Sequence, residues 1–296
     1  MYGTDASDLK ALKAKLDQQV KAKQGQPASG HPPVMLRRMK QDILEGLPSK
    51  TFKTYPVPMP PEQSAAYERA VAAAKHGDRS MGAMLKAIHA LRGISLHPNG
   101  HDGIDVYDSR ARTKWIAQSA RVSTTLTILA DIQRAGDKAL VFIEDRAVQS
   151  AFASAVAAEF GLERDPDIIN GALAGEKRQA VVDRFQSLPE GFAVLVLSPK
   201  AAGIGLTITA ANHVVHLSRW WNPAVEDQCN DRVYRIGQVK PVTIHVPIAV
   251  HPALGDASFD VKLDSLLDRK RTLSRDMLAP PVADGDVAEL FAGAID

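Results

Sequence analysis

Short apolar runs alternate with amphipathic stretches over the second half of the chain. The apolar runs are ALVFI at 139–143, AVLVL at 193–197, HVVHL at 213–217 and VTIHVPI at 242–248. Between them, apolar residues recur at helical spacing, as they do from Val148 to Phe160 and from Val181 to Phe185. Continuous apolar strands interleaved with helices are typical of a parallel sheet that helices cover on both faces. We therefore expect an α/β domain of this kind over residues 119–250.

The regions before this domain have other patterns. Apolar residues recur at helical spacing between Leu9 and Val20, and a Gly-, Pro- and Ser-rich stretch follows, so residues 1–33 are predicted to form a helix and a linker. Residues 34–59 are basic and contain many prolines, which favours an extended connection over packed structure.

Residues 60–118 are predicted to form a helical insertion. The pattern is helical from Pro60 to about Leu96, and two prolines at its start suit the first turn of a helix. Residues 98–118 are polar and contain glycine, which indicates an excursion over the surface.

Residues 251–296 follow the predicted sheet. One long basic helix is expected from Ala257 to Met277. The acidic, alanine-rich stretch from Val282 to the C-terminus is expected to be frayed.

The charges nearly cancel, with 36 Lys and Arg against 34 Asp and Glu, so any surface for nucleic acid must be local. Basic residues gather in 36–53 and again in 262–275, although such runs are most often solvated helix faces.

The single cysteine, Cys229, excludes an internal disulfide and a multi-cysteine metal site. With neither an apolar stretch of about 20 residues nor a signal peptide, a reducing, cytoplasmic compartment is expected and a membrane partner is not.

In a doubly covered parallel sheet, ligands bind beyond the carboxyl ends of the strands. The run at 193–197 is followed by SPKAAGIGLTITAAN, in which Gly203 and Gly205 allow the backbone to approach a ligand closely. Ser198 adds a hydroxyl and Lys200 a positive charge. A plain structural turn explains this stretch equally well, and it is no P-loop because the Gly-Lys-Ser/Thr ending is missing.

The run at 213–217 is followed by SRWWNPAVEDQCNDRVYRIGQ. A helix should begin at Asn222 and Pro223 and end at Gly237. Gln228, Arg232 and Arg235 would lie on one face of it, and Asp231 could orient Arg235 through an ion pair. Two arginines aimed at a strand-end cleft suit a triphosphate, but spacing alone favours a pair of surface arginines in salt bridges.

A resemblance decides between these interpretations. QCNDRVYRIGQ resembles the sixth helicase motif of the SWI/SNF-type branch of helicase superfamily two, SPKAAGIGLTITAAN the fifth, and SRWWNP the segment between them. LRRMKQDILEGLPSK resembles the connection between the two lobes of these ATPases, LRGISLHPNG a helical stretch, KALVFIE the fourth motif and NGALAGEKRQAVVDRFQ the block after it. The stretch WWNPAVEDQCNDRVYRIGQ resembles bacterial members of the family, which favours a prokaryotic source. Arg121 departs from the family pattern, because a lysine is commoner at that position. The resemblance implies a C-terminal, RecA-like lobe with a C-terminal brace helix.

In this family two RecA-like lobes close over ATP and Mg²⁺ and move along double-stranded DNA. The resemblance implies that Arg232 and Arg235 are arginine fingers, that Gln228 and Asp231 support the nucleotide site, and that Gly203 and Gly205 couple it to the DNA path. The residues that it places beside DNA are Ser198, Lys200 and Trp221, with Arg37, Arg38 and Lys40 in the basic connection. For Trp221, core packing at a helix start is an equally good interpretation, and Trp220 has no family role.

The sequence contains neither a P-loop nor an Asp-Glu-x-His box, so phosphoryl transfer has no phosphate cradle and no metal ligands. We expect this chain to bind no ATP or Mg²⁺ alone and to need an N-terminal RecA-like lobe, in the same parent chain or as a separate subunit. The alternative is a non-catalytic module that binds nucleic acid or protein and retains the fold. His213, His216 and His245 are expected to be structural, because no second ligand stands at metal-type spacing.

Overall fold

The computed structural model describes residues 46–78, 80–100, 105–200, 205–276 and 284–295. The chain divides into two compact units, and nearly all of the described residues belong to the one made of Leu47–Arg269 and Pro281–Asp296. The predicted helix and linker at 1–33 lie outside the described residues. So do Arg37, Arg38, Lys40 and Gly203, which leaves those predictions untested.

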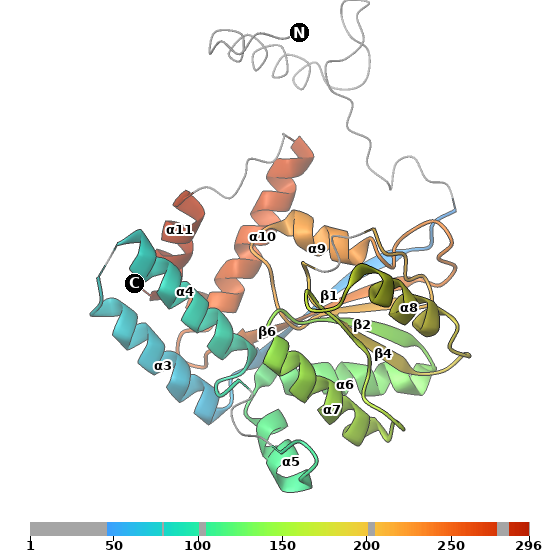
Figure 1. Ribbon diagram of the computed structural model, residues 1–296. Coiled ribbons are helices and arrows are strands. Elements are labelled where there is room, and N and C mark those ends of the chain that lie inside the picture. The colour runs from blue at the N-terminus through green and yellow to red at the C-terminus, as the bar shows by residue number, and fades with distance from the viewer. Residues whose placement is uncertain (1–45, 79, 101–104, 201–204, 277–283, 296) are drawn as a thin grey trace, which may run out of the picture. The chain divides into compact units, whose positions relative to one another are not determined.

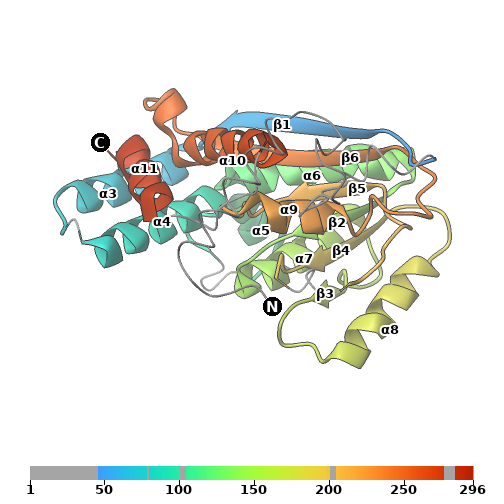
Figure 2. The ribbon, with the colours of Figure 1, turned by 90° about the horizontal axis from the view of Figure 1, so that it is seen from above.

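The described part of the chain contains a six-stranded parallel sheet with the order β1-β6-β5-β2-β4-β3 (Figure 2). Its strands are β1 (Lys50–Pro58), β2 (Lys138–Phe142), β3 (Ile168–Ile169), β4 (Ala193–Leu197), β5 (His213–His216) and β6 (Val242–Val250). The helices are α3 (Pro61–Lys75), α4 (Met81–Leu96), α5 (Ser109–Ala117), α6 (Ala120–Ala135), α7 (Arg146–Phe160), α8 (Gly175–Gln186), α9 (Pro223–Asn230), α10 (Phe259–Asp276) and α11 (Asp284–Ile295), with a 3₁₀ turn at Gly255–Ala257.

Alternate residues of β2 divide the core into two layers, because successive side chains of a strand point to opposite faces. Ala139 and Val141 belong to one apolar cluster with residues of α6 and α7. Leu140 and Phe142 belong to another with residues of α8 and α9. Figures 1 and 2 show helices on both faces of the sheet, so the predicted RecA-like α/β fold is confirmed.

The prediction for residues 50–58 was wrong, because they form β1 rather than an unpacked connection. Nine residues of β1 pair in parallel with β6 at the edge of the sheet. Ser49 O accepts from Val242 N and Met59 N donates to Val250 O, so the odd-numbered residues bond β6. Pro56 and Pro58 therefore face the open edge, where a missing N–H costs no ladder hydrogen bond.

Two further predictions needed correction. Within 98–118, predicted to be a polar surface excursion, α5 buries Trp115, whose Nε1 donates to Gly100 O at 2.7 Å and whose ring stacks on His97. The C-terminal end, predicted to be frayed, forms α11. This helix buries Leu290, Phe291, Ala294 and Ile295 against α3 and α4. Apolar residues three to four apart give α11 a buried face that its alanine-rich composition conceals.

A row of polar side chains crosses β1, β6 and β5. Tyr55 Oη lies 2.8 Å from His245 Nδ1, His245 Nε2 lies 3.0 Å from His213 Nδ1, and His213 Nε2 lies 3.3 Å from Asp137 Oδ2. His216 Nε2 lies 2.8 Å from Asn230 Oδ1, so all three strand histidines have a partner within the fold, as predicted. Within the described ranges, no group of three or more His, Cys, Asp or Glu is placed to hold a metal ion.

Acidification is expected to destabilise this row. Burial, with the charges of His213 and Lys53, lowers the pKa of His245 to about 3. The pKa of an unfolded histidine is about 6.5. Below that pH the unfolded chain therefore binds a proton at His245 that the folded chain does not bind. The free energy of unfolding should therefore fall as pH decreases from about 6.5 toward 3.

Urea unfolding of wild type and His245→Gln at pH 7.5, 6.5 and 5.5 measures this effect. The variant should show a flatter pH dependence, whereas His76→Gln, at an exposed histidine of α3's C-terminal end, should match wild type. Identical slopes in wild type and His245→Gln would contradict the prediction.

Candidate functional site

The two segments that the sequence marks as separate motifs meet in the structure. The amide of Ile208 donates to Arg232 O at 2.8 Å, and Arg232 Nη1 donates to Leu206 O at 3.1 Å. Gln238 Nε2 donates to Ala211 O at 2.7 Å. These three bonds join the stretch after β4 to the stretch after α9. The two segments therefore lie side by side.

The helix expected to carry the arginines ends early. Asn222 caps α9 through Ala224 N, as predicted, but the helix ends at Asn230 with Asp231 as its C-cap. Arg232 and Arg235 follow in irregular turns, so the prediction that they share one helical face with Gln228 was wrong. The helical ladder stops because Arg232 N donates to Cys229 O at 3.2 Å instead of Gln228 O, while Arg232 O accepts from Ile208 N outside the helix.

The position of the arginines along the sheet also differs from the prediction. Because α9 runs back from the carboxyl ends of the strands, the segment after it approaches their amino ends. Gln238 bonds Ala211 O, two residues before β5, and its own amide donates to Arg235 O. The arginines therefore lie beside the sheet, toward the amino ends of its strands, and not in a cleft beyond the carboxyl ends.

The two arginines differ in exposure. Arg232 is 7% exposed, and its Nε has no hydrogen-bond partner. Burial lowers the pKa of Arg232, while the charge of Asp231 raises it. Arg235 and Gln228 are exposed. The predicted pairing of Asp231 with Arg235 stays a prediction, and Gly205 has the left-handed φ of +46° that suits glycine.

Residues predicted to approach DNA follow the carboxyl ends of β4 and β5. We call this end of the sheet, where its strands finish, the carboxyl edge. Ser198 is half-buried and its amide donates to Ile169 O at 2.9 Å, at the end of β3. Lys200 is exposed, with Nζ 5.1 Å from the centre of the Trp220 ring. Trp221 is half-buried, packs against the helical cluster and meets the ring of His89 edge-on at 5.5 Å. Trp221 thus combines core packing with partial exposure.

Arg92 of α4 also belongs to this site, although no pattern in the sequence pointed to it. Its guanidinium lies 4.9 Å from the Trp220 ring and 5.9 Å from the Trp221 ring. Nε and Nη2 both donate to Arg219 O, at 3.1 and 2.8 Å, and Nη2 pairs with Glu144. No local pattern could reveal this contact, because Arg92 and Arg219 are 127 positions apart.

Buried ion pairs hold the carboxyl edge to the helices. Arg219 Nε donates to Glu226 of α9 at 2.8 Å, and Nη1 donates to Asp264 of α10 at 2.7 Å. Burial opposes the charge of Arg219, but Glu226 and Asp264 outweigh it and raise the pKa of Arg219. Beside them, Arg121 of α6 lies 3.4 Å from Asp260 of α10, both buried. Three helices are thereby joined to the end of β5.

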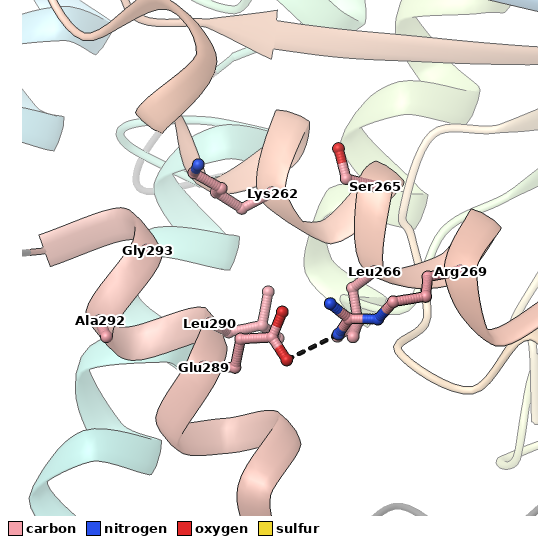
Figure 3. A pocket seen from close by; sticks show the side chains of 8 residues that line it. All are labelled: Lys262, Ser265, Leu266, Arg269, Glu289, Leu290, Ala292 and Gly293. Atoms are coloured by element: carbon pink, nitrogen blue, oxygen red, sulfur yellow. Dashed lines mark hydrogen bonds and ion pairs between the residues drawn. The ribbon is translucent and has the colours of Figure 1, made fainter.

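A pocket of about 520 Å³ lies between α10 and α11 (Figure 3). Its lining residues are Lys262, Ser265, Leu266, Arg269, Glu289, Leu290, Ala292 and Gly293. In Figure 3 the carboxylate of Glu289 points toward the guanidinium of Arg269, at 2.6 Å. None of the predicted site residues lines this pocket, so it is separate from the candidate site.

No helix in the described residues combines the length and apolar character that a membrane crossing needs.

The chain is similar to known proteins of the helicase type. Residues 121–237 match the family described as helicase conserved C-terminal domain. The chain is 34% identical over 279 residues to Zorya protein ZorD of Escherichia coli O139:H28, covering 88% of this chain and 25% of ZorD. It is 31% identical to the putative ATP-dependent helicase/translocase YwqA of Bacillus subtilis, covering 82% of this chain and 26% of YwqA.

Among solved structures, the Sulfolobus solfataricus SWI2/SNF2 ATPase core in complex with dsDNA superposes with a TM-score of 0.64 at 27% identity. That match covers 99% of this chain and 57% of the other. A parallel sheet with these strand-end segments defines a RecA-like lobe of the helicase type. The chain belongs to the SWI2/SNF2 ATPases and corresponds to their C-terminal lobe. It spans about a quarter of the length of the curated relatives named above.

Proposed function

We propose that this chain is the C-terminal motor lobe of an ATP-dependent translocase on double-stranded DNA, supplying arginine fingers and part of the DNA track. The observation that carries the proposal is the junction of the two motif segments, in which Arg232 bonds both Leu206 and Ile208. A change at the arginines is transmitted through these bonds to the segment that follows β4, which begins with Ser198 and Lys200. Such a junction suits a lobe that couples nucleotide to DNA.

The arginine pair suits a polyphosphate held by a partner lobe. Arg235 is exposed, and Arg232 carries an N–H without a partner on a nearly buried guanidinium. Planar guanidinium groups bind phosphate oxygens well, and ATP with Mg²⁺ would supply the phosphoryl group and the metal that neutralises its charge. In this proposal the N-terminal RecA-like lobe holds the nucleotide and metal, and Arg232 and Arg235 contact the phosphates, with Gln228, Asp231 and Gly205 supporting them.

The carboxyl edge suits a DNA backbone. Lys200 presents a positive charge and Trp221 a half-exposed ring, while Ser198 adds a hydroxyl. Lysine binds phosphates without sequence preference, and an aromatic ring can pack on a sugar or a base. The likeness to a solved ATPase core that contains double-stranded DNA supports placing duplex DNA here.

Steady-state ATP hydrolysis, with and without duplex DNA, tests the proposal. This chain alone should show background turnover only, because its sequence has no P-loop. Adding a separately made P-loop lobe of the same family should produce DNA-stimulated turnover that Arg232→Ala removes.

Two outcomes would contradict the proposal. DNA-stimulated turnover by this chain alone, abolished by Arg232→Ala, would mean that it contains a complete nucleotide site. Salt-sensitive DNA binding together with two-lobe turnover that ignores Arg232 would favour the non-catalytic binding module instead.

A further inference from the structure

The turn that carries the two tryptophans has little regular structure of its own. Residues 217–222 lie between β5 and α9 and belong to neither a helix nor a strand. Trp220 N donates to Glu226 Oε1 at 3.1 Å, and Ser218 N donates to Phe142 O at 2.9 Å. The carbonyl of Arg219, in the middle of the turn, accepts both of its hydrogen bonds from Arg92 of α4.

The rings themselves are arranged around the same side chain. Moving from Lys200 to His89, charged or imidazole groups alternate with indole rings. Lys200 lies over Trp220, Arg92 lies over Trp220 and Trp221, and His89 meets Trp221 edge-on. Cations over indole rings attract them, more strongly where water is excluded. Arg92 therefore contacts the main chain of the turn and both of its rings.

Arg92 is poorly placed to bind phosphate itself. Its side chain is 12% exposed, Nη2 pairs with Glu144 after β2, and Nε and Nη2 are used by Arg219 O. Most of its N–H groups therefore serve the protein. By contrast, Lys200 is exposed and the two rings are half-exposed, so a ligand at this edge would meet them first.

We propose that Arg92 is a positioning residue that sets the Trp220–Trp221 pair at the carboxyl edge of the sheet, so that α4 determines where the aromatic contact to duplex DNA lies. The placement of the rings is inferred from the contacts of Arg92 with Arg219 O and with both indole rings. Their contact with DNA rests on the proposed function.

Quenching of tryptophan fluorescence by acrylamide tests the placement without any DNA. Arg92→Met keeps the length of the side chain but removes its charge and N–H groups, and Arg92→Lys keeps the charge without the planar fork. Both should increase quenching, since Trp220 and Trp221 lose their anchor while Trp115 stays buried. Arg69→Met, at an exposed arginine of α3, is the matched control and should quench like wild type.

Duplex DNA binding by the full chain tests the consequence. Arg92→Met should weaken binding by roughly 10-fold, as expected for an aromatic contact that is displaced. Adding Arg92→Met to the double variant Trp220→Ala/Trp221→Ala should weaken binding no further, because Arg92 acts through these two rings. The slope of log affinity against log salt should stay that of wild type, whereas loss of a direct phosphate contact would reduce it by about 1.

Unchanged quenching in Arg92→Met would overturn the proposal, and so would a further loss of binding when Arg92→Met is added to the variant lacking both tryptophans, or a reduced salt slope. If wild type binds no duplex DNA, the proposed function fails, whereas quenching still decides whether Arg92 positions the rings.

Discussion

Replacing Arg235 by alanine is expected to lower kcat for DNA-stimulated ATP hydrolysis by a factor of ~10³–10⁵ in a two-lobe enzyme, with little effect on stability. Arg235 is exposed at the end of the segment after α9, so its side chain is not part of the packed core. Changes at such surface positions usually alter the free energy of unfolding by less than about 0.5 kcal/mol. The loss should therefore be one of catalysis alone.

Arg232→Ala provides the informative comparison. It should lower kcat as well, but it also removes a nearly buried side chain whose Nη1 bonds Leu206 O. Leaving a buried carbonyl without its donor costs about 1–3 kcal/mol, so the unfolding midpoint should fall too. Hydrolysis assays with a P-loop lobe, together with urea unfolding, measure both quantities. Arg134→Ala, at an exposed arginine of α6, should change neither. Full turnover in Arg235→Ala would remove this arginine from the proposed site.

Replacing Arg219 by methionine is expected to cost about 3–5 kcal/mol of stability, the penalty for leaving buried charges without their partner. Glu226 is 2% exposed and accepts from both Arg219 and Trp220 N, and Asp264 of α10 loses the same guanidinium. Domains of this size are stable by about 5–15 kcal/mol, so such a loss is a large fraction of the total.

Urea unfolding followed by circular dichroism measures the effect, provided the m-value stays constant. The matched control is Arg184→Met, which breaks a pair with Asp167 on the surface, where the arginine side chain is 45% exposed. Exposed pairs of this kind contribute about 0–1 kcal/mol. Equal midpoints for the two variants would show that the Arg219 pairs add no more than a surface pair does.

Much of the central fold could be predicted because its signals are local. Four apolar runs and the helices between them were located from hydrophobic periodicity, and the predicted N-cap Asn222 is where the structure begins α9. Cys229 is buried. These features depend on residues within one or two turns of each other, and local pattern is sufficient for them.

The candidate site was predictable in composition and less so in geometry. The motifs placed arginines and glycines near one another in the chain, and Arg232 does meet the segment that follows β4. The irregular turn that holds Arg232 could not be predicted, because the carbonyl of Arg232 accepts from Ile208 N, which lies 24 residues earlier in the chain. The strand-end rule also misplaced the arginines, since the segment after α9 lies toward the amino ends of the strands, where Gln238 bonds Ala211 O.

The sequence by itself determined the fold class, the family and the residue types of the site, because each follows from short periodic patterns or contiguous motifs. Only the tertiary structure decided that residues 50–58 form an edge strand, where Tyr55 meets His245 from 190 positions away. It also decided that α11 is buried and that Arg92 supports the tryptophan turn. The physical reason is the same in each case. A hydrogen bond or a packing contact between distant segments satisfies groups that look exposed or unpaired in the local sequence, and no local period records which partner will satisfy them.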